Sequence, residues 1–122
     1  MKIIIAGTKY IADFDFVNRK LTKILSNYHN GKKYIDLEVV SGGSEDLDIL
    51  GDTWATLNKV PVKVFPAVID IHKSKARKVL NTEMLEYADL LIVFVTETST
   101  PTDELAFAAE EAGLTVRRIK YA

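Results

Sequence analysis

Three short polar segments of this sequence carry groups that could bind a phosphorylated ligand. They are Gly7-Thr8-Lys9, Ser41-Gly42-Gly43-Ser44 and Thr96–Thr102. Glycine lets the backbone approach a ligand closely, and free N–H groups at a helix start attract anions. Lysine adds a positive charge, and the serine and threonine hydroxyls donate and accept hydrogen bonds. Together these groups favour a ligand that carries phosphate and ribose.

Each polar segment directly follows a short apolar run. Runs of this length and composition predict buried strands at Lys2–Ala6, Leu37–Ser41 and Leu90–Val95. Two further strands are predicted at Pro61–Phe65, which begins with proline and therefore suits a sheet edge, and at Leu114–Ile119. Arg117, Arg118 and Lys120 at the last strand would discourage pairing at an open edge.

Helical spacing separates the predicted strands. Apolar residues at intervals of three and four predict a helix over about 13–28, with Phe14, Val17, Leu21, Ile24 and Tyr28 on one face. The same reasoning predicts a second helix with Leu47, Leu50, Trp54 and Leu57 on its face, and a third within Ser74–Tyr87 with Ala76, Leu80, Met84 and Tyr87. A fourth helix is predicted with Thr100 as N-cap and Pro101 at its first position, ending at Gly113.

Alternation of strands and helices predicts a parallel sheet covered on both faces. Only the first and fourth strands read as continuous apolar runs, Ile3–Ala6 and Leu90–Val95, as central parallel strands do, so we place them side by side. The predicted fold is a three-layer, Rossmann-like α/β doubly wound sheet with strand order 3-2-1-4-5, and residues 1–122 form one domain. Ligands of such sheets bind beyond the carboxyl ends of the strands where the order reverses. The three polar segments meet at that edge.

Composition excludes several classes of protein. The chain has 122 residues, no cysteine, two histidines and a formal net charge of −1. Disulfide scaffolds, thiolate zinc sites and thiol nucleophiles are thereby excluded, and a histidine-rich metal site is disfavoured. No apolar stretch is long enough to span a membrane, and the lack of a basic excess disfavours nucleic-acid binding. Neither GxGxxG nor GxxxxGK[ST] occurs. We expect a cytoplasmic protein without a cofactor or a metal.

The order of these motifs resembles the YspA/YpsA-related SLOG family, within the superfamily of Rossmann-like proteins that includes the phosphoribohydrolases of the lysine-decarboxylase-like group and the DNA-loading protein DprA. The resemblance covers nearly the whole chain. It rests on the runs ending in Gly7-Thr8-Lys9 and Ser41-Gly42-Gly43, on Asp48 through Ala55, Val62–Pro66, Asn81 with Met84, Tyr87-Ala88-Asp89, and Ser99–Thr102. It implies binding of a nucleotide or a nucleotide-derived molecule, such as an ADP-ribose or NAD-derived ligand, and a homodimer.

This sequence departs from the family pattern at charged positions. The opening Gly-Ser-Arg of the family is here Gly7-Thr8-Lys9, and lysine cannot make the bidentate phosphate contacts of arginine. In the second motif, Glu45 replaces arginine and Asp46 replaces glycine. These carboxylates are favourable at a helix start, and their negative charge offsets the positive potential that would attract phosphate there. Glu45 or Asp48 would then accept hydrogen bonds from ribose, and phosphate would lie over Lys9 and the helix start at Thr100–Thr102.

Catalysis is the second hypothesis. The related phosphoribohydrolases use a Gly-Gly-x-Gly-Thr-x-x-Glu loop after the fourth strand. The stretch here, 98–104, has no glycine, and Glu104 follows Thr102 by two residues rather than three. Cleavage of a glycosidic bond needs a placed carboxylate, for which Glu45 and Glu104 are the candidates. We assign neither as catalytic.

Three functions therefore stay open. The first is binding of a nucleotide-derived ligand by a sensor, carrier or sequestering protein. The second is cleavage of the N-glycosidic bond of a nucleotide, and the third is binding of single-stranded nucleic acid. The predicted ligand-binding residues are Gly7, Thr8, Lys9, Ser41, Gly42, Gly43, Ser44, Glu45, Asp48, Asn81, Ser99, Thr100, Pro101 and Thr102.

Overall fold

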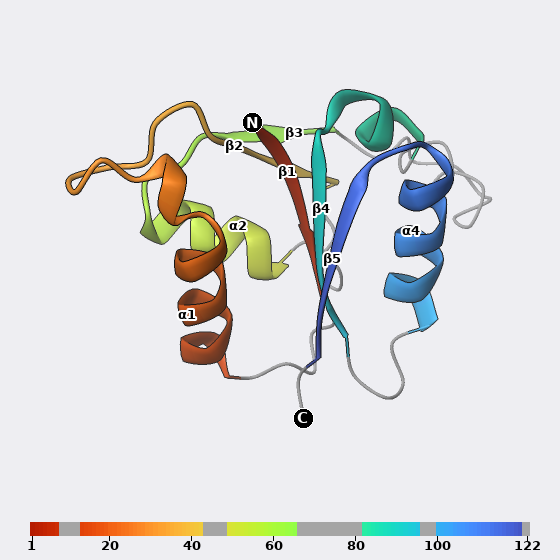
Figure 1. The fold of residues 1–122 in the computed structure, drawn as a ribbon, viewed down its shortest axis with the longest axis horizontal. Coiled ribbons are helices and arrows are strands. Elements are labelled where there is room, and N and C mark those ends of the chain that lie inside the picture. Colours follow the sequence, from red (N-terminus) through yellow and green to blue (C-terminus); the bar gives the residue numbers. More distant parts are fainter. Residues whose placement is uncertain (8–12, 43–48, 66–81, 96–99, 121–122) are drawn as a thin grey trace.

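A single parallel sheet of five strands organises the chain, in the order β3-β2-β1-β4-β5 (Figure 1). The computed structural model describes residues 1–7, 13–42, 49–65, 82–95 and 100–120, and of residues 49 and 100–104 only the backbone. The strands are β1 (Lys2–Ala6), β2 (Glu38–Ser41), β3 (Val62–Val64), β4 (Leu90–Val95) and β5 (Thr115–Lys120). The predicted fold class and strand order are confirmed.

The two apolar strands β1 and β4 are neighbours in the middle of this sheet. Their register pairs Ile3 with Leu90 and Ala6 with Val93. Residues 3–6 of β1 and 91–94 of β4 are buried, because helices cover both faces of the sheet at these strands. The prediction made from the uninterrupted apolar runs is therefore confirmed.

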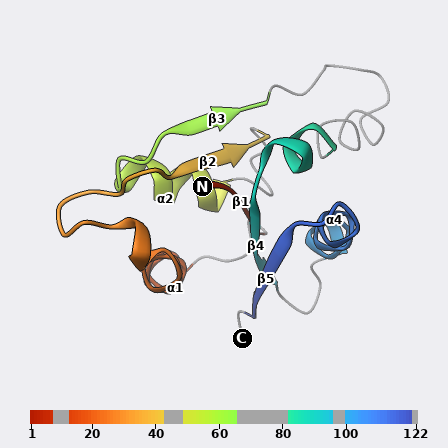
Figure 2. The same cartoon turned by 45° about the horizontal axis from the view of Figure 1, so that its top comes forward.

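Helices form a layer on each face of the sheet (Figure 2). On one face, α1 (Phe14–Ile24) and α2 (Ile49–Leu57) pack over a core that includes Ile3, Ile5 and Phe94. On the other face, the helical segment 82–87 and α4 (Thr100–Glu111) pack over a core that includes Ile4 and Val93. Successive side chains of a strand point to opposite faces, so β1 and β4 contribute to both cores.

The first helix is shorter than its apolar spacing predicts. α1 ends at Ile24, and a separate 3-10 turn, η1 (Ser26–Tyr28), follows it. The prediction of one helix over 13–28 is wrong beyond residue 24, because the backbone tightens from α-helical to 3-10 geometry while Tyr28 still packs against the core. At its start, the Asp13 carboxylate caps the helix by accepting a hydrogen bond from the Phe16 N–H at 3.1 Å.

The second helix buries a narrower face than predicted. Trp54 is fully buried, as expected, and its ring meets that of Tyr34 edge-on at a centroid distance of 5.1 Å. Leu57 is 65% exposed, so its placement on the buried face is wrong. It is the last residue of α2, after which the chain turns towards β3, so the core does not reach it.

The last helix ends in a left-handed turn at Gly113, where φ is +88°. The Gly113 N–H donates to the Glu110 carbonyl, and the Leu114 N–H donates to the Ala109 carbonyl, which is the pairing of a Schellman motif. The predicted helix end is thus confirmed. At the other end, Thr100 is already a helical residue, so the prediction that Thr100 is the N-cap and Pro101 the first helical residue is wrong by one position.

Polar contacts join the amino ends of the strands to one another, at the edge of the sheet opposite the predicted site. The Asp89 N–H donates to the Lys2 carbonyl, and the Asp89 carboxylate accepts from the Lys2 N–H at 2.9 Å. The Tyr87 hydroxyl donates to the Glu38 carboxylate, which raises the pKa of Tyr87. The Lys2 ammonium lies 4.2 Å from the centre of the Tyr87 ring. These contacts tie segment 82–87 to the starts of β1 and β2.

Candidate functional site

The carboxyl ends of β1 and β4 lie side by side at the point where the strand order reverses. From this edge the chain enters α1 on one face of the sheet and α4 on the other (Figure 2). β2 ends beside β1, with Val40 opposite Ile4. The edge that the sequence predicts as the binding site is therefore the carboxyl edge of three adjacent strands, the geometry at which doubly wound sheets bind ligands.

Gly7 follows β1 directly and is buried. A β-carbon there would come within 2.4 Å of the Leu50 Cδ1 atom and 3.4 Å of the Phe94 Cβ atom. The space that a side chain would need is thus filled by Leu50 of α2. Gly7 therefore has a packing role that sequence reasoning did not foresee, in addition to the ligand-binding role predicted for its backbone.

Ser41 and Gly42 form the matching end of β2. Both are buried, with Ser41 only 1% exposed. The Ser41 carbonyl accepts a hydrogen bond from the Phe65 N–H at 2.8 Å, which holds the end of β2 against the chain that follows β3. Together with Gly7, these residues form the floor of the carboxyl edge.

The other predicted site residues lie partly or wholly outside the described part of the chain. Thr100, Pro101, Thr102 and Glu104 belong to the first turns of α4, where only the backbone is described. The predicted positions that fall outside the described residues are Thr8, Lys9, Gly43, Ser44, Glu45, Asp48, Asn81 and Ser99.

Helix starts gather at this edge because each helix follows a parallel strand. A helix start carries partial positive charge and attracts anions. At α1 that charge is already matched by the Asp13 cap and by Asp15 in the first turn. Acidic side chains therefore already offset the positive charge at the start of α1. α4 begins with Thr100 and Pro101, and its first turns also carry two acidic residues, Asp103 and Glu104.

The described side chains offer no metal site, and their pKa shifts lie elsewhere in the fold. Within the described ranges, no group of three or more histidine, aspartate or glutamate side chains could hold a metal ion. The two pKa shifts found there belong to Tyr87 and to Glu110, whose pKa is lowered by its hydrogen bond from Arg118. Neither residue is in the predicted site. No described helix is long and apolar enough to cross a membrane.

A comparison with models of protein families identifies the family of this chain. The model of the YspA, cpYpsA-related SLOG family matches residues 1–72, more than half of the chain. The chain belongs to this SLOG family. No curated protein and no solved structure matched it.

The SLOG match covers β1, α1, β2, α2 and β3. It therefore includes the first two polar segments, which follow β1 and β2. The third polar segment follows β4, which lies beyond the match but pairs with β1 in the same sheet. Membership of the family indicates a nucleotide-related, Rossmann-like protein.

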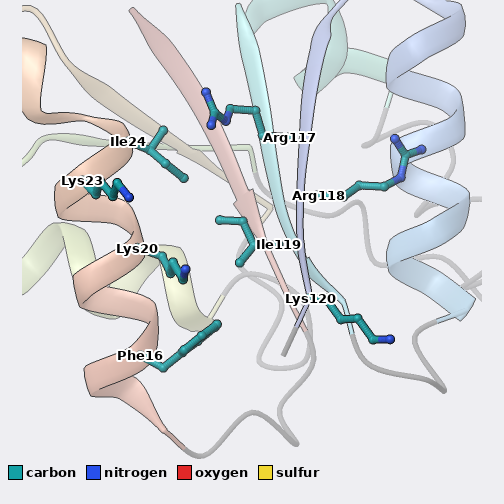
Figure 3. A pocket seen from close by; sticks show the side chains of 8 residues that line it. All are labelled: Phe16, Lys20, Lys23, Ile24, Arg117, Arg118, Ile119 and Lys120. Atoms are coloured by element: carbon teal, nitrogen blue, oxygen red, sulfur yellow. The ribbon is translucent and has the colours of Figure 1, made fainter. Parts of the chain in front are cut away.

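A second feature was missed by sequence reasoning. Lys20 and Lys23 of α1 face Arg117 of β5 across a pocket, far from the carboxyl-edge floor residues in the sequence (Figure 3). The spacing of the two lysines, three residues apart on one helix, places them on the same face and was the available signal. Their relation to Arg117 depends on the sheet order and could not be seen from local spacing.

Proposed function

We propose that this SLOG protein binds a nucleotide or a nucleotide-derived ligand at the carboxyl edge of β1 and β4. The observation that carries the proposal is the adjacency of these two strands, whose register is continuous from Ile3–Leu90 to Ala6–Val93. Adjacent central strands followed by helices on opposite faces create the crevice that such ligands occupy. Membership of the SLOG family supports the same ligand class.

Roles within the proposed site follow from residue chemistry. The backbone at Gly7 and Gly42 lines the base of the crevice, and Lys9 supplies positive charge for a phosphate. The start of α4, with the hydroxyls of Thr100 and Thr102, contributes hydrogen-bond donors to the phosphate. Glu45 or Asp48 accepts hydrogen bonds from ribose hydroxyls.

Thermal unfolding with a panel of mononucleotides, NAD, ADP-ribose and cyclic nucleotides tests this proposal. A ligand at about 100 times its Kd stabilises the folded state by about 2.7 kcal/mol, which raises Tm by several degrees. Lys9→Ala should reduce the shift. Lys33→Ala is the matched control, because Lys33 is exposed and lies in the turn that precedes β2, at the opposite end of the sheet.

The outcomes separate the hypotheses. Stabilisation by a ligand that mass spectrometry then recovers intact supports a binding protein. Recovery of a free base would instead establish cleavage of the N-glycosidic bond, and Glu45→Gln and Glu104→Gln would identify the carboxylate. If no member of the panel raises Tm, or if Lys9→Ala and Lys33→Ala behave alike, the proposed site is wrong.

A further inference from the structure

A pocket of about 520 Å³ opens between α1 and β5, on the face of the sheet that α1 covers (Figure 3). Its walls come from two elements that are far apart in the sequence. The lining residues are Phe16, Lys20, Lys23 and Ile24 of α1 and Arg117, Arg118, Ile119 and Lys120 of β5. We call this pocket the α1–β5 groove.

Positive charge is concentrated in the α1–β5 groove. Five of the 16 basic residues of the chain line it, and none of the 17 acidic residues does. The whole chain has a net charge of −1, so the groove is strongly basic within a nearly neutral protein. A local field of this sign attracts anions.

Three of these cations face the interior of the groove. Figure 3 shows Arg117 pointing from β5 towards α1, and Lys20 and Lys23 pointing from α1 towards β5. Arg118 and Lys120 point to the other side of β5, where Arg118 forms an ion pair with Glu110 of α4. Among the described residues, no carboxylate pairs with Lys20, Lys23 or Arg117.

An apolar floor lies beneath these charges. Phe16, Ile24 and Ile119 are half-buried and pack against the core on this face. The Phe16 ring meets Phe94 edge-on at a centroid distance of 6.3 Å, and the Lys20 ammonium lies 5.6 Å from the centre of the Phe16 ring. The floor is thus held by the core, while the exposed cations remain able to move onto a ligand.

Structural roles account for part of this charge only. Lys23 lies in the last turn of α1, where a cation is favourable to the helix dipole. Cations on β5 discourage another strand from pairing with an open sheet edge. Neither role requires Lys20 and Arg117 to face each other across one pocket.

We propose that the α1–β5 groove is a second binding site, for a small ligand that carries a polyphosphate group next to an apolar or aromatic group. The guanidinium of Arg117 matches phosphate oxygens bidentately, and the two lysines neutralise further charge. Adjacent phosphates carry several negative charges in a row, which suits cations placed on both walls of the groove. The volume lies within the roughly 300–1,000 Å³ of typical small-molecule sites. This site does not depend on the function proposed above.

Titration of the whole protein with inorganic triphosphate, followed by NMR of the backbone amides, tests the site directly. Saturable shifts are expected at 115–120 and in α1, and the affinity should fall as salt is raised. Adenosine triphosphate should bind more tightly than triphosphate alone, because its base adds contact with the apolar floor. Changes confined to Gly7 and Gly42 would instead report on the carboxyl edge, so failure of one proposal is distinguishable from failure of the other.

Paired variants sharpen the test. Arg117→Gln and Lys20→Gln should each weaken triphosphate binding by about tenfold, the effect of losing one charge-assisted hydrogen bond. Arg19→Gln is the control, because Arg19 is an exposed cation of the same helix that does not line the groove. All three side chains are exposed, so Tm without ligand should stay unchanged.

The second site is wrong if neither triphosphate nor adenosine triphosphate produces saturable shifts at 115–120 and in α1. If a single-stranded oligonucleotide produces such shifts under the same conditions, the groove instead recognises a nucleic-acid backbone. The site is also wrong if Arg117→Gln and Lys20→Gln bind triphosphate as strongly as Arg19→Gln does.

Discussion

Strands β4 and β5 pair with each other along their whole length, but the side chains of β4 are mostly buried and those of β5 are mostly exposed. Each has six residues, and the two pair in register from Leu90–Thr115 to Val95–Lys120. Residues 91–94 of β4 are buried, whereas 115, 117, 118 and 120 of β5 are exposed. The difference arises because β4 has strands on both sides and β5 ends the sheet.

The inner strand β4 contributes mainly to the stability of the fold, and the outer strand β5 contributes to the proposed α1–β5 groove. The inner strand supplies apolar side chains to both cores, and burial of such side chains stabilises the fold. The outer strand supplies Arg117, which faces Lys20 across the α1–β5 groove. Substitutions should therefore change stability in β4 and ligand binding in β5.

The largest expected effect compares the same residue type in the two strands. Ile92→Ala in β4 removes a fully buried side chain and should lower the free energy of unfolding by about 2–5 kcal/mol. Ile119→Ala in β5 removes a half-buried one and should cost about 1 kcal/mol. Urea denaturation measures both. Equal losses would contradict the division between the inner and outer strands.

A second expected effect concerns the packing of α2 on β1, the other inner strand. A β-carbon at Gly51 would lie 2.9 Å from the Ile5 Cβ atom and 3.0 Å from the Ile5 carbonyl oxygen. Gly51→Ala should destabilise the protein by about 1–3 kcal/mol through this overpacking. At an exposed position of a helix, the same Gly→Ala change would stabilise the protein by about 1 kcal/mol. The sign of the change in the free energy of unfolding, measured by urea denaturation, therefore shows whether Ile5 packs against Gly51.

A third, smaller effect is expected where β1 and β4 begin. Asp89→Ala removes the carboxylate that accepts from the Lys2 N–H and should cost about 1 kcal/mol. Asp89→Asn keeps a side-chain acceptor and should cost less. Hydrogen exchange of the Lys2 amide should quicken in the alanine variant. An unchanged rate would show that this contact does not hold the inner pair together.

The smallest expected effect lies on the outer strand, in the exposed pair of Arg118 and Glu110. The Arg118 hydrogen bond lowers the pKa of Glu110 from its ordinary 4.5. The pair therefore stabilises the fold above the ordinary pKa, and this stabilisation disappears as pH falls through the lowered pKa. Glu110→Gln should be slightly less stable than the parent protein near neutral pH, and the gap should close in strong acid. A gap that does not depend on pH would contradict the pairing.

The sheet could be predicted because its evidence is local and strong. The uninterrupted apolar runs of β1 and β4 require burial on both faces, and that requirement fixes the strand order. The error at the end of α1 arose because Tyr28 keeps helical spacing with Ile24 although the backbone between them changes to 3-10 geometry. The spacing of apolar residues cannot distinguish an α-helix from a 3-10 turn when the Tyr28 side chain packs against the core in either case.

The sites were predicted less completely. Gly7 and Ser41 could be placed at one edge because parallel strands end together, but the packing of Leu50 beside Gly7 depends on how α2 lies over the sheet. The α1–β5 groove escaped prediction because Lys20 and Arg117 are distant in the sequence. Cations on an edge strand have a sufficient local explanation, so β5 alone gave no reason to expect a binding site.

We expect a nucleotide-derived ligand to bind at the carboxyl edge of β1 and β4. The most direct measurement is NMR titration of the backbone amides with the nucleotide that most raises Tm. Saturable shifts at Gly7 and Gly42 that are lost in Lys9→Ala and kept in Lys33→Ala are the predicted result. Saturation of shifts confined to β5 and α1, with Gly7 and Gly42 unmoved, would contradict the claim.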